Sequence, residues 1–129
     1  TSFSQLRREG LDAQRWNLLH PEEEPRVPYV TAALDGHGGP VVAATDYMRL
    51  LPDGIRPFLD RRYLVLGTDG YGRSDKRDAL RRFFEVDRHY VAVAALKALA
   101  ADGELPAAKV AEAIAKYGID PEKPNPVTV

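Results

Sequence analysis

The fold is decided by the stretch YLVLGTDGYGRS, which spans residues 63–74. Its first four residues form a short apolar run, typical of a strand that is buried on both faces of a sheet. The glycines at positions 67, 70 and 72 permit a left-handed backbone or a close approach between segments. Ser74 or Asp75 can cap a helix that follows directly. A strand that leads through glycines into a capped helix predicts an α/β corner, and such corners often carry function.

Apolar patterns on both sides of this corner predict alternating helices and strands. A second buried strand is expected at residues 41–44, and Phe84-Glu85-Val86 fits either a third short strand or an extended link. Residues 29–34 fit a strand or a helix, and we favour the helix because alanine is a strong helix former. The chain thus predicts a three-layer α/β domain with a small, mostly parallel sheet. The other expected helices cover residues 4–19, a stretch after Thr45 or Asp46, the segment after Ser74, residues 88–101 behind the cap Asp87, and residues 106–117.

Length and composition exclude several classes of protein. The 129 residues suggest one domain, and the formal net charge of −1 argues against a general nucleic-acid binder. The absence of cysteine excludes disulfides and thiolate catalysis and favours a reducing compartment, so we expect a cytoplasmic protein. No apolar run approaches the length of a membrane span. The first residue is Thr1 rather than Met, from which we expect a fragment or a processed chain.

The glycine-rich corner could be interpreted as a phosphate site, because Arg73 and Lys76 lie beside a predicted helix start. Its spacing fits neither a P-loop nor a dinucleotide-binding fingerprint, and Asp69 adds a negative charge. We therefore favour a structural turn in which the carboxylate of Asp69 binds backbone amides.

No other residues group into a recognisable catalytic or metal site. The three histidines, at positions 20, 37 and 89, have no metal-type spacing, and Ser74 lacks the context of a nucleophile. His89 falls in the first turn of a predicted helix, where a surface or interface role is the simpler expectation. The sequence accordingly predicts no catalytic, cofactor-binding or metal-ligating residue in this chain.

Several stretches resemble the C-terminal region of the homodimeric, bacterial-type pyruvate dehydrogenase first component. The resemblance covers essentially the whole chain in one register. It rests on RWNLLHP at 15–21, PRVPY at 25–29, ATDYM at 44–48, VLGTDGYGRSD at 65–75, FEVD at 84–87, VAAL at 93–96 and AIAK at 113–116.

This resemblance implies a much longer, three-domain subunit of which residues 1–129 form the last domain. That domain is transketolase C-terminal-like, with a five-stranded mixed sheet flanked by helices. Thiamine diphosphate and Mg²⁺ would lie in the other domains of a homodimer, which decarboxylates pyruvate and transfers acetyl to the lipoyl groups of a dihydrolipoyl acetyltransferase core. The chain itself would be a structural and dimerisation domain, inactive alone and without a cofactor.

The residues expected at an interface or channel wall lie in the corner and at the start of the next helix. Two alternatives stay open: an anion-binding or partner-docking module at this corner, and the same domain from an enzyme for another 2-oxo acid such as 2-oxoglutarate. The candidate interface residues are Asp69, Gly70, Tyr71, Arg73, Ser74 and His89.

Overall fold

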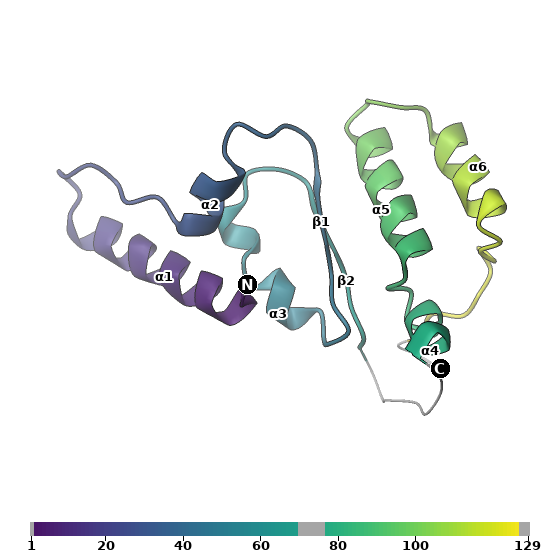
Figure 1. Ribbon diagram of the computed structural model, residues 1–129. Helices are drawn as coiled ribbons and strands as arrows, with labels where there is room; N and C mark the ends of the chain where they lie inside the picture. Colours follow the sequence, from purple (N-terminus) through teal and green to yellow (C-terminus); the bar gives the residue numbers. More distant parts are fainter. Residues whose placement is uncertain (1, 70–76, 127–129) are drawn as a thin grey trace.

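The computed structural model describes residues 2–69 and 77–126. These ranges form a two-stranded sheet with helices on both faces (Figure 1). Strand β1 (Val41–Ala44) is parallel to β2 (Tyr63–Leu66), with Val41 opposite Tyr63. Both strands have the predicted bounds. The five-stranded sheet implied by the resemblance is not formed within the described ranges, which contribute these two strands.

One face of the sheet is covered by the helices of the first half of the chain, α1 (Phe3–Leu19), α2 (Tyr29–Leu34), α3 (Leu50–Asp53) and the 3₁₀ helix η1 (Arg56–Phe58). Alternate strand residues point toward them, because successive side chains of a strand face opposite sides. The hydrophobic core of this side contains Val30, Ile55, Phe58 and Tyr63, with Val41, Ala43 and Val65 packed against it.

Helix α1 is continuous through a glycine that would ordinarily weaken it. Gly10 is buried, and a Cβ atom placed on it would lie 2.5 Å from the ring of Phe58. The glycine therefore lets the aromatic ring of η1 pack directly on the helix backbone. Close packing of a core aromatic residue outweighs the intrinsic cost of glycine at this position.

The opposite face is covered by α5 (Arg88–Ala101), which contacts both strands, with α6 (Ala107–Lys116) packed against α5 (Figure 1). The predicted cap of α5 is confirmed, because the carboxylate of Asp87 accepts a hydrogen bond of 3.0 Å from the backbone N–H of Tyr90. The predicted helices at 4–19, 29–34, 88–101 and 106–117 are all confirmed within two residues.

The helix predicted directly after Thr45 or Asp46 is wrong in its start and its cap. Helix α3 begins only at Leu50 and has no side-chain cap. The hydroxyl of Thr45 instead accepts a 3.1 Å hydrogen bond from the N–H of Tyr47, which closes a local turn.

The third strand proposed for Phe84-Glu85-Val86 is also wrong. This segment ends helix α4 (Arg77–Phe83) in a turn in which Glu85 takes φ 64°. The N–H of Val86 donates to the carbonyl of Arg81 at 2.9 Å, and that of Glu85 to Arg82 at 3.2 Å, the Schellman pattern of a helix end. These bonds use backbone groups that a strand would need for pairing.

Candidate functional site

The loops that leave the carboxyl ends of β1 and β2 are joined by an ion pair. The carboxylate of Asp69 accepts hydrogen bonds from the backbone N–H of Arg49 at 3.0 Å and from its Nε at 2.7 Å. The N–H of Thr68 donates to the carbonyl of Tyr47 at 2.8 Å. Asp69 thus binds a backbone amide, as expected, but the amide belongs to Arg49 in the loop after β1, and residues 70–72 of the expected turn lie outside the described residues.

Gly67 makes this close approach possible. A Cβ atom at that position would lie 2.5 Å from Cγ of Arg49 and 3.0 Å from its backbone nitrogen. Any larger residue would push the two loops apart. The hydrogen bond from the Arg49 N–H, followed by those from its side chain, holds the pKa of Asp69 below its ordinary value. The ion pair of Arg49 and Asp69 is thus a fixed structural connection at the carboxyl edge of the sheet.

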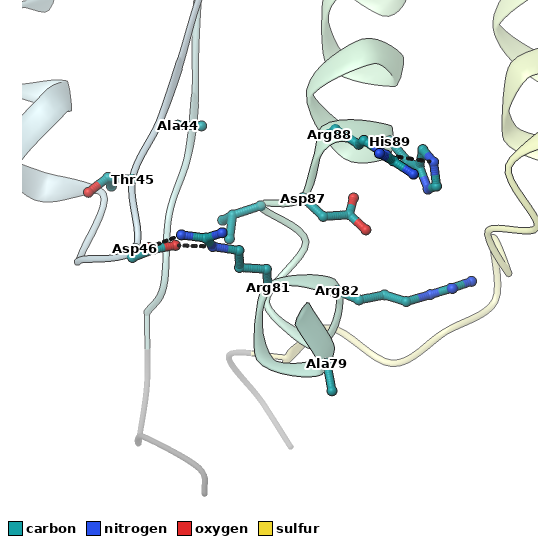
Figure 2. Close-up of a pocket in the computed structure, with 10 residues that line it drawn as sticks. Ala44, Thr45, Asp46, Ala79, Arg81, Arg82, Asp87, Arg88 and His89 are labelled. Carbon is teal, nitrogen blue, oxygen red and sulfur yellow. Dashed lines mark hydrogen bonds and ion pairs between the residues drawn. The ribbon is translucent and has the colours of Figure 1, made fainter. Parts of the chain in front are cut away.

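A wide hollow of about 770 Å³ lies between the loop after β1, helix α4 and the start of α5, and we call it the arginine hollow. Figure 2 shows Arg81 reaching across it to Asp46, while Arg88 and His89 project from the first turn of α5. It is lined by Ala44, Thr45, Asp46, Ala79, Arg81, Arg82, Val86, Asp87, Arg88 and His89.

The three arginines of this hollow differ in their partners. Arg81 makes a two-pronged ion pair with Asp46, at 3.1 Å from Nε and 2.9 Å from Nη2. Arg82 donates to the carbonyl of Gly118 at 3.3 Å, and Arg88 donates to Nε2 of His89 at 3.4 Å. The described lining of the hollow therefore carries three arginines against two aspartates, Asp46 and Asp87, an excess of positive charge.

A second hollow of about 330 Å³ lies on the other side of the same edge, and we call it the tail hollow. It is lined by Arg49, Gly67 and Asp69 at the strand ends and by Pro121 and Lys123 of the C-terminal tail. The predicted residues Asp69 and His89 are thus placed in different hollows. Gly70, Tyr71, Arg73 and Ser74, with Lys76, lie outside the described residues.

His89 is half-buried rather than freely exposed. Its ring stacks on that of Tyr117 with centroids 4.7 Å apart and an angle of 7° between the planes. It therefore joins the first turn of α5 to the end of α6. The stack supports a packing role for His89, which sequence spacing could not reveal because the two residues are far apart in the chain.

Residues that could ligate a metal ion are not clustered in the described part of the chain. Residues 2–69 and 77–126 contain no group of three histidine, aspartate or glutamate side chains that could hold a metal ion. In the arginine hollow, Asp46 is paired with Arg81 and Asp87 caps α5, so a magnesium diphosphate group does not fit their present arrangement. Within the same ranges, no helix is long and apolar enough to cross a membrane.

Sequence reasoning missed the exposed apolar residues of the first half of the chain. The side chains of Leu18, Leu50 and Tyr29 are 77%, 73% and 66% exposed. Isolated exposed apolar residues are common, but here they recur at the end of α1 and around α3. The full set comprises Leu11, Leu18, Leu19, Val27, Tyr29, Tyr47, Met48, Leu50 and Leu51.

The family described as the transketolase-like C-terminal domain matches residues 1–87. Among curated proteins, the chain is 59% identical over 128 residues to the pyruvate dehydrogenase E1 component of Cupriavidus necator. It is 58% identical over 127 residues to that of Pseudomonas aeruginosa and 53% identical over 127 residues to that of Escherichia coli K12. These alignments cover 98–99% of the chain but only 14% of each relative's length.

Proposed function

The chain belongs to the family of transketolase-like C-terminal domains, and on that premise we propose that it is a structural and dimerisation domain of a pyruvate dehydrogenase first component. The observation that carries this proposal is the 59% identity over 128 residues to a protein of that name. The resemblance of the corner stretch at residues 65–75 points in the same direction.

In the proposed enzyme, thiamine diphosphate with Mg²⁺ supplies the carbanion chemistry that decarboxylates pyruvate. Acetyl transfer to lipoyl groups of a dihydrolipoyl acetyltransferase core completes the reaction. Following the resemblance, we assign the cofactor to the other domains of the subunit, and we propose that this subunit is cytoplasmic. The chain contributes packing surface, and no chemical step is assigned to its residues.

The surface of α5 supports a role in assembly. The helix is apolar around most of its circumference, yet Ala98 is its one fully buried residue, and the side chains of Val91, Val93 and Leu96 are half-buried. A helix that is apolar on all sides is ordinarily buried. We propose that α5 and the corner at residues 67–75 contact the second subunit of a homodimer or the other domains of the same subunit.

The sheet of the described residues has only two strands. Parallel sheets normally have several strands and helices over both faces. The sheet of β1 and β2 has helices on both faces. We therefore propose that further strands from the longer subunit complete the five-stranded mixed sheet implied by the resemblance. Their backbone groups would pair with the outer edges of β1 or β2.

Substitution in α5 tests the assembly role. Ala95→Trp in the full-length enzyme adds a large ring to a half-buried position, and we expect it to shift the dimer toward monomer in sedimentation velocity. Ala111→Trp, at an exposed position of α6, is the matched control and should leave the dimer unchanged. An intact dimer in the Ala95→Trp enzyme would refute this role. Gly70→Glu applies the same test to the corner, outside the described residues.

A second candidate function is binding of an anion in the arginine hollow, favoured by the three arginines and two aspartates that line it. Titration of the chain with inorganic phosphate in a calorimeter distinguishes the two functions. The structural role predicts no measurable heat of binding, whereas an anion site predicts saturable binding that Arg88→Ala weakens. The parent substrate is tested separately, by comparing turnover of pyruvate and 2-oxoglutarate in the full-length enzyme.

A further inference from the structure

We propose that Lys123 and Glu85 form a latch that holds the C-terminal tail, residues 119–126, against the end of α4 and thereby positions the junction between α4 and α5. Nothing in this inference depends on the proposed enzymatic function, because it rests on contacts within the chain. It makes Lys123 a positioning residue for the walls of both hollows.

The backbone of Glu85 is in an unusual conformation. This residue occupies the position after the end of α4 with φ 64°, a left-handed conformation that glycine usually supplies at helix ends. A glutamate there is strained relative to glycine, because its Cβ crowds the following carbonyl. The strain is explained if the carboxylate is needed, since glycine would offer the same backbone without it.

The carboxylate of Glu85 contacts the ammonium group of Lys123. Nζ of Lys123 lies 3.2 Å from Oε1 of Glu85 and donates to the carbonyl of Phe83 at 2.8 Å. It also lies 5.1 Å from the centre of the Phe83 ring. One ammonium group thus contacts the carboxylate of Glu85, a backbone carbonyl at the end of α4 and an aromatic face.

The backbone of the tail around Lys123 is held in a turn by hydrogen bonds within the tail. The carboxylate of Asp120 accepts a 2.9 Å hydrogen bond from the N–H of Glu122, and its carbonyl accepts one of 3.1 Å from the N–H of Lys123. Pro121 and Pro124 restrict the backbone on both sides. A segment that is already turned and stiffened loses little conformational entropy when its lysine docks.

Both residues of the latch line the tail hollow. The tail lines the tail hollow together with the ion pair of Arg49 and Asp69. At the end of α6, Gly118 accepts the hydrogen bond from Arg82 of the arginine hollow. Residues 70–76 connect Asp69 to α4 in the sequence. The ion pair of Asp69 holds the loop before this segment, and the latch holds the end of the helix after it.

Hydrogen exchange in the full-length protein tests the latch at the amides of Glu85 and Val86, which donate to α4. Lys123→Met should speed exchange of both amides about tenfold, as expected for loss of one charge-assisted hydrogen bond. Lys123→Arg should retain slow exchange, because it keeps the charge. Lys109→Met removes an exposed lysine that pairs with Glu112 at 3.6 Å and should leave both amides unchanged. Unchanged exchange in Lys123→Met, or an equal effect of Lys109→Met, would overturn the latch.

Glu85 is tested by two further substitutions. Glu85→Gln keeps the side-chain length and should release the tail, seen as faster proteolytic cleavage within residues 119–126. Glu85→Gly should relieve the backbone strain yet still release the tail, so cleavage accelerates while resistance of the whole protein to urea is unchanged or higher. If cleavage of the tail stays at the wild-type rate in both variants, Glu85 does not hold Lys123 and the proposal fails.

Discussion

The two halves of the molecule differ in the large apolar side chains that they expose. In residues 2–69, large side chains such as Phe58 and Tyr63 form a core under the sheet, while the exposed large apolar residues among the described ranges all lie between Leu11 and Leu51. In residues 77–126, Phe84, Val86, Ala98 and Val110 are buried, and polar contacts of Arg81, Arg82 and Lys123 also connect the elements. Both halves therefore bury apolar residues and use polar contacts between distant residues, and they differ in the exposed large apolar residues, which the described part of the second half lacks.

The largest effect is expected from the core of the first half. Phe58→Ala should lower the free energy of unfolding by about 3–5 kcal/mol, because it removes a buried ring and leaves a cavity over Gly10. Urea unfolding of the chain measures it. Leu18→Ala, at a residue that is 77% exposed, should change stability by less than about 0.5 kcal/mol. If Phe58→Ala and Leu18→Ala lowered the free energy of unfolding by similar amounts, the assignment of Phe58 to the core would be wrong.

A smaller effect is expected at Tyr63, which joins the sheet to α3. Its hydroxyl donates at 2.7 Å to the carbonyl of Pro52, and Tyr63→Phe should cost about 1–3 kcal/mol because that buried carbonyl loses its partner. The exposed Tyr29→Phe is the control and should cost almost nothing. Equal stability of Tyr63→Phe and the wild type would contradict the role of this hydrogen bond.

The titration of Tyr63 gives an independent check. Burial, more than any nearby charge, raises the pKa of Tyr63 from 10.0 to about 12. The folded state binds the phenol proton more tightly than the unfolded state, so this contribution to stability is full below pH 10. It should be lost as the pH rises from 10 to about 12. Stability measured against pH should decline less steeply there for Tyr63→Phe than for the wild type.

The smallest effect is expected at the ion pair that joins the strand ends. Asp69→Asn should cost about 1 kcal/mol, because it keeps a side-chain acceptor but loses the charge that pairs with Arg49. The pKa of Asp69 is lowered in the folded state, so its contribution is present above the ordinary value of 3.8 and is lost as the pH falls through the lowered pKa. Asp53→Asn, in a more exposed pair with Arg56, should cost less. The reverse order would contradict a structural role for Asp69.

Much of the fold could be predicted from local sequence. The two strands, the bounds of α5 and its cap Asp87 all leave short-range signals, because a strand or a cap is defined by a few neighbouring residues. The start of α3 was not predictable, because the turn of Thr45 competes with capping. At Glu85, a non-glycine residue takes a left-handed conformation that sequence rules assign to glycine.

The candidate site was less predictable than the fold. Asp69 and His89 were identified as candidates, but their partners Arg49 and Tyr117 lie 20 and 28 positions away in the chain. Asp46 and Arg81 are 35 residues apart, and Phe83 and Lys123 are 40 apart. Such contacts depend on how the elements pack, so neither composition nor local spacing reveals them.

The central claim is that this chain builds structure while the chemistry resides elsewhere in the longer subunit. Its most direct test is release of CO₂ from pyruvate in the presence of thiamine diphosphate and Mg²⁺. We predict release by the full-length protein that contains this chain and none by residues 1–129 alone. Release of CO₂ by residues 1–129 alone would contradict the claim.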